Sequence, residues 1–135
     1  MKKIIWSDEF SVGVNVLDEQ HKVIIKLINK LLDNQNARVN SEVISDLLGE
    51  MRIYMDNHLK YEEKLLKDNG YPNLEQHVAM HNEYGEKFGE LIFSVMNNNT
   101  DAPENILQYL KDWWTNHILH EDMKYRPFFE RKGVI

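Results

Sequence analysis

Cysteine is absent from the 135-residue chain. Its absence excludes a disulfide framework, thiolate-bound zinc, iron–sulfur clusters and a thiol nucleophile, so any metal ion must be held by histidine, aspartate or glutamate. The chain has no apolar run close to the roughly 20 residues that span a membrane. It also has no excess of positive charge, because 16 Lys and Arg stand against 22 Asp and Glu. A net charge of −6 argues against nucleic acid as a partner, since phosphates are neutralised by basic side chains.

Glycine and proline are scarce, with six and three residues, and Gly70 and Pro72 lie between two apolar segments. A composition of 42% hydrophobic and 28% charged residues is typical of a soluble globular protein, and the length suits one domain spanning 1–135. We therefore expect a cytoplasmic monomer with no membrane and no nucleic-acid partner.

Apolar residues recur at intervals of three and four positions in four segments, which is the period of an amphipathic helix. The predicted helices span about 18–34, 41–69, 73–97 and 102–126. Asp18 and Ser41 are predicted N-terminal caps, Gly70 a C-terminal cap, and Pro127 the end of the fourth helix. Short connections make neighbouring helices antiparallel, so the predicted fold is all-α, an up-down-up-down antiparallel four-helix bundle. Residues 1–17 alternate weakly and are predicted to form an extended N-terminal arm on the bundle.

Five of the six histidines share the apolar faces of these helices, and two carboxylates follow two of them at four and five residues. The set comprises His21, His58, Glu62, His77, His81, His117 and Asp122. Taken alone, a core histidine is more often a hydrogen-bonded structural residue, and the i,i+4 pair His77 and His81 fits either role. A metal centre explains better why all four helices repeat the pattern, because five imidazoles and two carboxylates are costly to bury without a cation.

The ligand chemistry narrows the choice of metal. Nitrogen and oxygen donors without sulfur suit iron, manganese or zinc. Seven ligands exceed one octahedron, so two metal ions are implied. If both carboxylates bridge, they supply four oxygens, and five nitrogens plus one solvent oxygen shared by both ions then fill eleven of twelve octahedral positions. One position is left open for a small molecule. The chain lacks both the Glu-x-x-His motif of ferritin-like diiron proteins and the His-Glu-x-x-His motif of zinc proteases, and its histidine-rich set favours redox binding over hydrolysis.

In their order and spacing these residues resemble the hemerythrin family, specifically its single-domain bacterial members. The resemblance covers essentially the whole chain and rests on several short motifs. They are Asp18-Glu19-Gln20-His21-Lys22, His58-x3-Glu62, His77-x3-His81 and His117-x4-Asp122, together with Trp6, Phe10-Ser11-Val12-Gly13-Val14 and Trp113.

This resemblance implies a non-haem diiron centre that binds dioxygen reversibly. It implies a six-coordinate iron held by His77, His81 and His117, and a five-coordinate iron held by His21 and His58. An oxo or hydroxo group, Glu62 and Asp122 would bridge the two irons.

The spacing of His117 and Asp122 does not suit a regular α-helix. At about 100° per residue, positions i and i+5 lie roughly 140° apart around the helix axis. We therefore predict a π-type bulge near Ile118–Glu121. His120 and Glu121, at i+3 and i+4 from His117, are the rival ligands on a regular helix. The resemblance favours Asp122, with His120 partly exposed and not a ligand.

An apolar pocket is expected around the open position. Trp113 and Ile118 match positions that line this pocket in the family, whereas Trp114 stands where leucine is common. Trp114 either reshapes ligand access or is only a larger core residue. Tyr125, near Asp122, is either a hydrogen-bonding partner of the centre or a packing residue.

The favoured function is reversible dioxygen binding for storage, delivery or scavenging, without catalysis, with a reductase or an oxygen-consuming enzyme as the partner to look for. A diiron oxidase, a peroxidase or a nitric-oxide-handling enzyme would use the same open position. Five neutral histidines favour O–O cleavage little, however, and no acid–base residue is evident in the predicted pocket. An oxygen or redox sensor acting through a separate partner is a third hypothesis, and a structural bundle with incidental histidines is the last.

Overall fold

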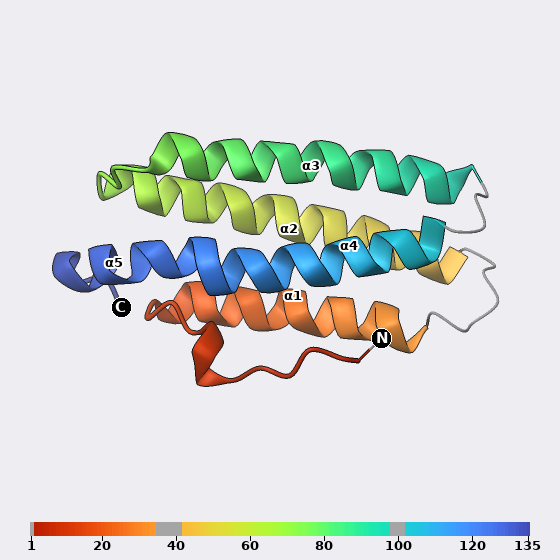
Figure 1. The fold of residues 1–135 in the computed structure, drawn as a ribbon, viewed down its shortest axis with the longest axis horizontal. Coiled ribbons are helices and arrows are strands. Elements are labelled where there is room, and N and C mark those ends of the chain that lie inside the picture. The colour runs from red at the N-terminus through yellow and green to blue at the C-terminus, as the bar shows by residue number, and fades with distance from the viewer. Residues whose placement is uncertain (1, 35–41, 98–101) are drawn as a thin grey trace.

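The computed structural model describes residues 2–34, 42–97 and 102–135. These residues form four long helices that run side by side, with consecutive helices in opposite directions (Figure 1). The helices are α1 (Asn15–Asp33), α2 (Glu42–Asp68), α3 (Leu74–Met96) and α4 (Ala102–Asn116), and the chain ends in the short helix α5 (Arg126–Lys132). Helix α1 packs against α2 and α4, and α3 packs against the same two helices. The predicted up-down-up-down bundle is confirmed.

Buried apolar side chains form two clusters along the bundle. The larger cluster lies between the four long helices and includes Ile24 and Ile28 of α1. The smaller cluster gathers around α5 and includes Leu66 and Phe129. Polar side chains are buried between the two clusters, at the level where α1, α2, α3 and the segment that follows α4 each contribute at least one histidine. Within the described residues, none of the helices is both long enough and apolar enough to cross a membrane.

The turn between α2 and α3 aligns these two helices. Gly70 adopts the left-handed backbone conformation, with φ of 76°, that side chains with a Cβ rarely take. The backbone N–H of Tyr71 donates to the carbonyl of Leu66 (2.9 Å), and that of Gly70 donates to Lys67 (3.1 Å). This is a Schellman ending, so the predicted glycine cap of α2 is confirmed. The predicted cap Ser41 lies outside the described residues.

Helix α1 begins at Asn15, earlier than predicted, and Asp18 does not cap it. Val14 occupies the N-cap position and makes no side-chain capping bond. Asp18 lies in the first turn, where its carboxylate accepts hydrogen bonds from the Ser11 hydroxyl (2.6 Å) and the Val12 backbone N–H (2.8 Å). The cap prediction was wrong, because the carboxylate ties the arm to the helix instead of capping the helix backbone.

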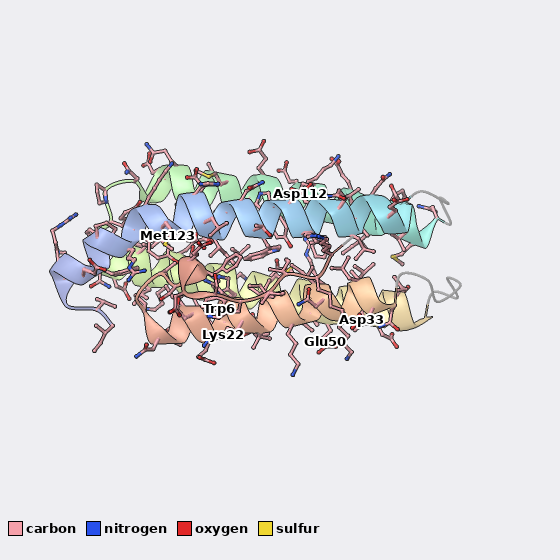
Figure 2. The ribbon with its side chains drawn as sticks, turned by 60° about the horizontal axis from the view of Figure 1, so that its bottom comes forward. Trp6, Lys22, Asp33, Glu50, Asp112 and Met123 are labelled. Carbon is pink, nitrogen blue, oxygen red and sulfur yellow. The ribbon has the colours of Figure 1, made fainter. Side chains whose placement is uncertain are left out.

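The N-terminal arm lies along α1 and is not extended throughout. It contains one turn of 3-10 helix at Asp8–Phe10. The backbone of Ile4 exchanges two hydrogen bonds with the Asn29 amide, each 2.8 Å long. In Figure 2, which labels Trp6 and Lys22, the arm follows α1 on the side toward α4. The Trp6 ring stacks on Phe10 at a centroid distance of 5.7 Å. The arm is thus attached to α1 near both of its ends, through Asn29 and through Asp18.

The segment after α4 keeps turning in the same direction but changes its hydrogen-bond pattern. A π-helical stretch covers His117–Glu121, a 3-10 turn covers Asp122–Tyr125, and α5 follows. Pro127 therefore does not end the last helix, and that prediction was wrong. It lies at the start of α5, where the N–H that proline lacks would have no partner in the helix.

Candidate metal centre

Seven titratable side chains are enclosed between the two apolar clusters. None of them is more than 4% exposed. One comes from α1, two from α2, two from α3, one from the π-helical stretch and one from the 3-10 turn after it. They are His21, His58, Glu62, His77, His81, His117 and Asp122, so the structure brings together every residue in the predicted set.

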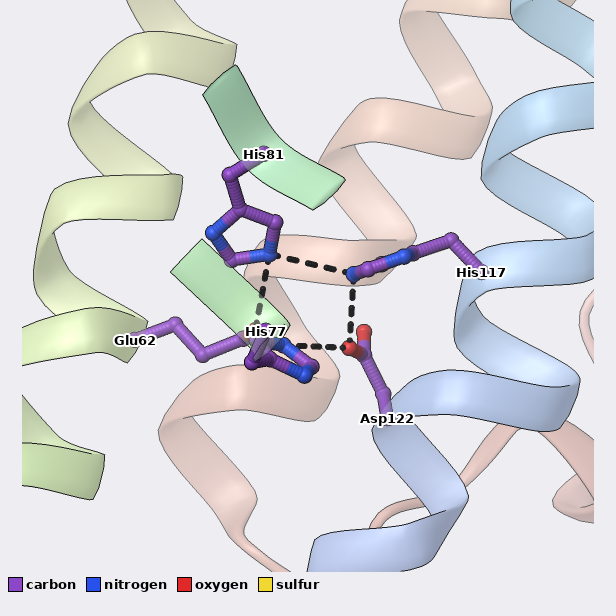
Figure 3. A group of neighbouring side chains, drawn as sticks. All are labelled: Glu62, His77, His81, His117 and Asp122. Atoms are coloured by element: carbon purple, nitrogen blue, oxygen red, sulfur yellow. Dashed lines mark hydrogen bonds and ion pairs between the residues drawn. The ribbon is translucent and has the colours of Figure 1, made fainter. Parts of the chain in front are cut away.

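Five of these side chains converge to form the three-histidine group, in which each residue offers a ligand atom within 4.8 Å of the others. Figure 3 shows Glu62, His77, His81, His117 and Asp122 pointing toward one another. His77 Nε2 lies 2.6 Å from Glu62 Oε1, and His117 Nε2 lies 3.0 Å from Asp122 Oδ1. The Nε2 atoms of His81 and His117 are 3.1 Å apart. These five atoms therefore face a single small volume.

Glu62 also belongs to a second group, the two-histidine group, with His21 and His58. Its other oxygen, Oε2, lies 3.7 Å from His21 Nε2 and 3.4 Å from His58 Nε2. Asp122 is divided in the same way, because its Oδ2 lies 3.3 Å from His21 Nε2. Each carboxylate thus directs one oxygen to each group.

The π-helical stretch brings Asp122 to the same side as His117. The backbone N–H of Asp122 donates to the carbonyl of His117, five residues earlier, instead of four as in an α-helix. The widened turn reduces the roughly 140° offset of a regular helix. The predicted bulge is confirmed. The rival His120 is exposed and belongs to neither group, and Glu121 is partly exposed.

Burial and the two carboxylates shift the pKa values of the cluster histidines in opposite directions. Burial by itself lowers the pKa of an imidazole, because the charged form loses its hydration. For His21 this effect is outweighed by the nearby carboxylates of Asp122, at 3.3 Å, and Glu62, at 3.7 Å, which raise its pKa to about 9. The same carboxylates raise the pKa of His77 to about 10 against burial. For His58 burial dominates and the pKa is lowered.

Both carboxylates are held ionised inside the protein. Burial would raise the pKa of Glu62, but hydrogen bonds from the surrounding histidines hold it well below its ordinary value. Burial and the charge of Glu62 would likewise raise the pKa of Asp122, but His117 and His21 hold it below its ordinary value. The cluster thus encloses two carboxylates that need positive partners, which protonated His21 and His77 supply in the metal-free protein and which bound cations can supply in their place.

Buried polar atoms without a hydrogen-bond partner indicate whether the residues of the cluster fit metal ions. In the part of the chain that the structure describes, five buried atoms of the cluster have no hydrogen-bond partner. They are Nδ1 and Nε2 of His21, Nε2 of His58, and both carboxylate oxygens of Asp122. Such atoms are costly to bury unless something pairs with them. Imidazole nitrogens and carboxylate oxygens are also ligands of iron, manganese and zinc, so the residues fit a pair of bound cations.

Three further residues that contact the cluster were not in the predicted ligand set. The Gln20 amide oxygen lies 2.7 Å from His58 Nδ1, and the Glu63 carboxylate lies 3.3 Å from His81 Nδ1. Tyr125 donates its hydroxyl to Glu62 Oε2 over 3.0 Å. Tyr125 is therefore a hydrogen-bonding partner, through Glu62 and not through Asp122. Gln20 and Glu63 adjoin ligands in the sequence but project from other sides of their helices, so the pattern of buried faces did not indicate them.

The three predicted pocket residues differ in their surroundings. Trp113 is partly exposed, stacks on His117 at a centroid distance of 4.2 Å, and lines an open groove with it. Trp114 and Ile118 are fully buried. The Trp114 ring lies 5.8 Å from that of His58, and its Nε1–H donates to the Tyr84 hydroxyl over 3.0 Å. Trp114 is thus a core residue whose indole is fixed by a hydrogen bond and lies beside His58 of the two-histidine group.

Comparisons with known proteins agree over most of the chain. Residues 12–129 match the model of the family described as the hemerythrin HHE cation binding domain. The bacteriohemerythrin of Pseudomonas aeruginosa (strain LESB58) is 29% identical over 125 residues, which cover 93% of this chain and 80% of that protein. The myohemerythrin of Theromyzon tessulatum is 28% identical over 121 residues, covering 90% of this chain and 89% of that protein. A solved structure of a hemerythrin with a leucine-to-alanine substitution matches with a TM-score of 0.86 and 29% identity, covering 94% of this chain and 97% of that chain.

Proposed function

Because this chain belongs to the hemerythrin family, we propose that it binds dioxygen reversibly at a non-haem diiron centre. The family is described as cation-binding, and the cluster of buried histidines and carboxylates is a place where cations can bind. The names bacteriohemerythrin and myohemerythrin among its relatives favour a carrier over an enzyme. Its role would be storage, delivery or scavenging of dioxygen in the cytoplasm.

The observation that carries the proposal is that the two oxygens of each carboxylate face different groups of histidines. Glu62 directs Oε1 toward the three-histidine group and Oε2 toward the two-histidine group, and Asp122 is divided in the same way. Carboxylates placed like this suit two ions, each with its own set of histidines. We assign one iron to the three-histidine group of His77, His81 and His117, and the other iron to the two-histidine group of His21 and His58. This leaves the iron with fewer nitrogen ligands as the one with the open position.

When bound, the two irons would supply the electrons that dioxygen accepts. The residues of the chain hold and orient the ligands for this chemistry. Tyr125 and Glu62 are both fully buried, and the Tyr125 hydroxyl donates to Oε2, the carboxylate oxygen that also faces His21 and His58. A hydrogen bond to the ionised carboxylate favours the charged form that binds metal.

We place the dioxygen pocket beside the two-histidine group, with Trp114 and Ile118 contributing to its walls and Trp113 adjoining them through its contacts with Trp114 and His117. Trp114 lies beside His58, and its bond to Tyr84 fixes the orientation of the indole. Ile118 is fully buried and adds an apolar surface. Apolar walls would exclude water, which competes for the open position and delivers protons.

The test is to reduce the iron-loaded protein without oxygen and then expose it to air. A visible absorption band that appears in air and disappears under argon, over repeated cycles, supports reversible binding. His21→Ala should abolish the band, because it removes one of two nitrogen ligands of the proposed binding iron. His120→Ala is the matched control, since His120 is exposed and belongs to neither group.

Other outcomes would point to the alternative functions. Irreversible oxidation with release of hydrogen peroxide, or turnover of nitric oxide or an organic substrate, would indicate an enzyme. A structural change that is transmitted only to an added partner protein would indicate a sensor. Either result would contradict the carrier proposal.

A further inference from the structure

The two groups of the cluster differ in what lies behind their histidines. In the two-histidine group, His58 Nδ1 faces the neutral amide oxygen of Gln20 at 2.7 Å. In the three-histidine group, His81 Nδ1 faces the carboxylate of Glu63 at 3.3 Å. Both contacts join different helices, because Gln20 is on α1 and Glu63 is on α2. The two outer partners therefore have similar positions but different charges.

Both contacts select the same form of the imidazole. An acceptor beside Nδ1 places the ring proton on that nitrogen and leaves the Nε2 lone pair directed into the cluster. The two partners are equivalent in this respect. They differ in electrostatics, because a carboxylate makes the imidazole a stronger ligand and adds a negative charge near the cation. The Glu63 side chain is 25% exposed, so solvent screens part of this effect.

We propose that Glu63 and Gln20 set the order in which the centre takes up its two metal ions. The Glu63 carboxylate strengthens the three-histidine group, which fills first. The neutral Gln20 leaves the two-histidine group weaker, and this group fills second. The inference rests on the diiron centre proposed above, but it concerns metal affinity in the absence of dioxygen.

The test is an oxygen-free titration of the metal-free protein with Fe²⁺ against a competing chelator, which resolves two dissociation constants. Mutation of an outer hydrogen-bonding partner typically costs 10–100-fold in metal affinity; because Glu63→Gln removes only the charge and Glu63 is partly exposed, we expect a loss near 10-fold. This loss should fall on the first, tighter step and leave the second within about threefold. Gln20→Glu should instead tighten the second step by about 10-fold.

Two further variants separate charge from geometry. Glu63→Gln keeps an acceptor for His81, whereas Glu63→Ala removes the acceptor as well and should weaken the first step further. Glu86→Gln removes one negative charge at an exposed position of α3 and should leave both steps unchanged. Circular dichroism of each metal-free variant verifies that the helices remain folded.

The outcomes are distinct. If Glu63→Gln binds like the unmodified protein and only Glu63→Ala is weakened, the partner acts by geometry and the proposal is overturned. A shift of the second step by Glu63→Gln would overturn the assigned order. If the unmodified protein binds two Fe²⁺ with no effect of any of these substitutions, this inference fails while the diiron centre stands. If no Fe²⁺ binds at all, both proposals fail.

Discussion

Tyr125→Phe tests how strongly the protein holds the carboxylate at the middle of the cluster. The hydroxyl of Tyr125 donates to Glu62 Oε2 over 3.0 Å, and neither side chain is exposed. The substitution removes one oxygen atom and keeps the ring, which packs against Phe129 at a centroid distance of 5.1 Å. The loss is therefore confined to the hydrogen bond.

The expected cost follows from the charge and from the remaining contacts. A hydrogen bond to a charged group contributes about 1.5–3 kcal/mol to stability. Phenylalanine leaves no unpaired polar atom of its own, and Glu62 Oε2 keeps its contacts with His58 at 3.4 Å and His21 at 3.7 Å. We therefore expect the lower part of the range, a loss of about 1.5–2 kcal/mol in the free energy of unfolding.

The loss should depend on pH in a defined direction. Folding lowers the pKa of Glu62 below its ordinary value of 4.5, so the ionised carboxylate stabilises the fold above that pH and the stabilisation is lost as the pH falls. The Tyr125 hydroxyl supports the ionised form. The difference between the two proteins should thus be complete at pH 7 and should shrink in acid.

Urea unfolding of the metal-free proteins, followed by circular dichroism at pH 7 and again in acid, measures this difference. Tyr109→Phe is the control, because Tyr109 is half-buried on α4 outside the cluster and should change stability by less than about 0.5 kcal/mol. If Tyr125→Phe were no more destabilising than Tyr109→Phe, the Tyr125 hydroxyl would not be supporting Glu62 and the reasoning would be refuted.

Four further results are expected. Tyr84→Phe removes the acceptor of the buried Trp114 N–H and should lower the free energy of unfolding by about 1–3 kcal/mol in the same urea titration; an unchanged midpoint would show that the N–H finds another partner. Asp18→Ala removes both hydrogen bonds that this carboxylate accepts from the arm, so limited proteolysis should cut the arm faster than in the unmodified protein, and equal rates would contradict its anchoring role. Ile118→Asp puts a charge into a fully buried wall and should speed decay of the air-dependent absorption band, whereas Ile118→Val should not; an unchanged decay rate counts against the pocket assignment. In the metal-free cluster the pKa values of His21 and His77 are raised to about 9 and about 10, so Fe²⁺ binding at pH 7 should release about two protons, and the affinity for Fe²⁺ should increase as the pH rises toward 9. Calorimetry in buffers of different ionisation enthalpy measures the number of protons released. A value near zero would show that these histidines are already neutral.

The bundle and the seven members of the cluster were predictable because helical periodicity is a local property. Apolar residues spaced by three and four positions define the inner face of a helix whatever packs against it, and His21 or His77 on that face must be buried. The π-helical stretch was predictable for a related reason. His117 and Asp122, five residues apart, share a face only where the helix widens.

The ends of the helices were harder to predict, since the same residue types occur on either side of a boundary. Pro127 could follow the last turn of one helix or begin the first turn of the next, because both positions tolerate a missing N–H. Asp18 could cap α1 or bind the preceding arm through the same carboxylate oxygens. Local preference does not distinguish these alternatives.

Contacts between helices depend on packing and were visible only in the folded molecule. The partners of His58, His81 and Glu62 lie 38, 18 and 63 residues away along the chain. Periodicity states which side of a helix a residue occupies but not what that side meets. Gln20 and Glu63, next to ligands in the sequence, point about 100° away from them around the helix. A hydrogen bond requires its two atoms within about 3 Å in a narrow range of angles. The register and separation of the packed helices set that distance, and they also determine how each carboxylate divides its oxygens between the two groups.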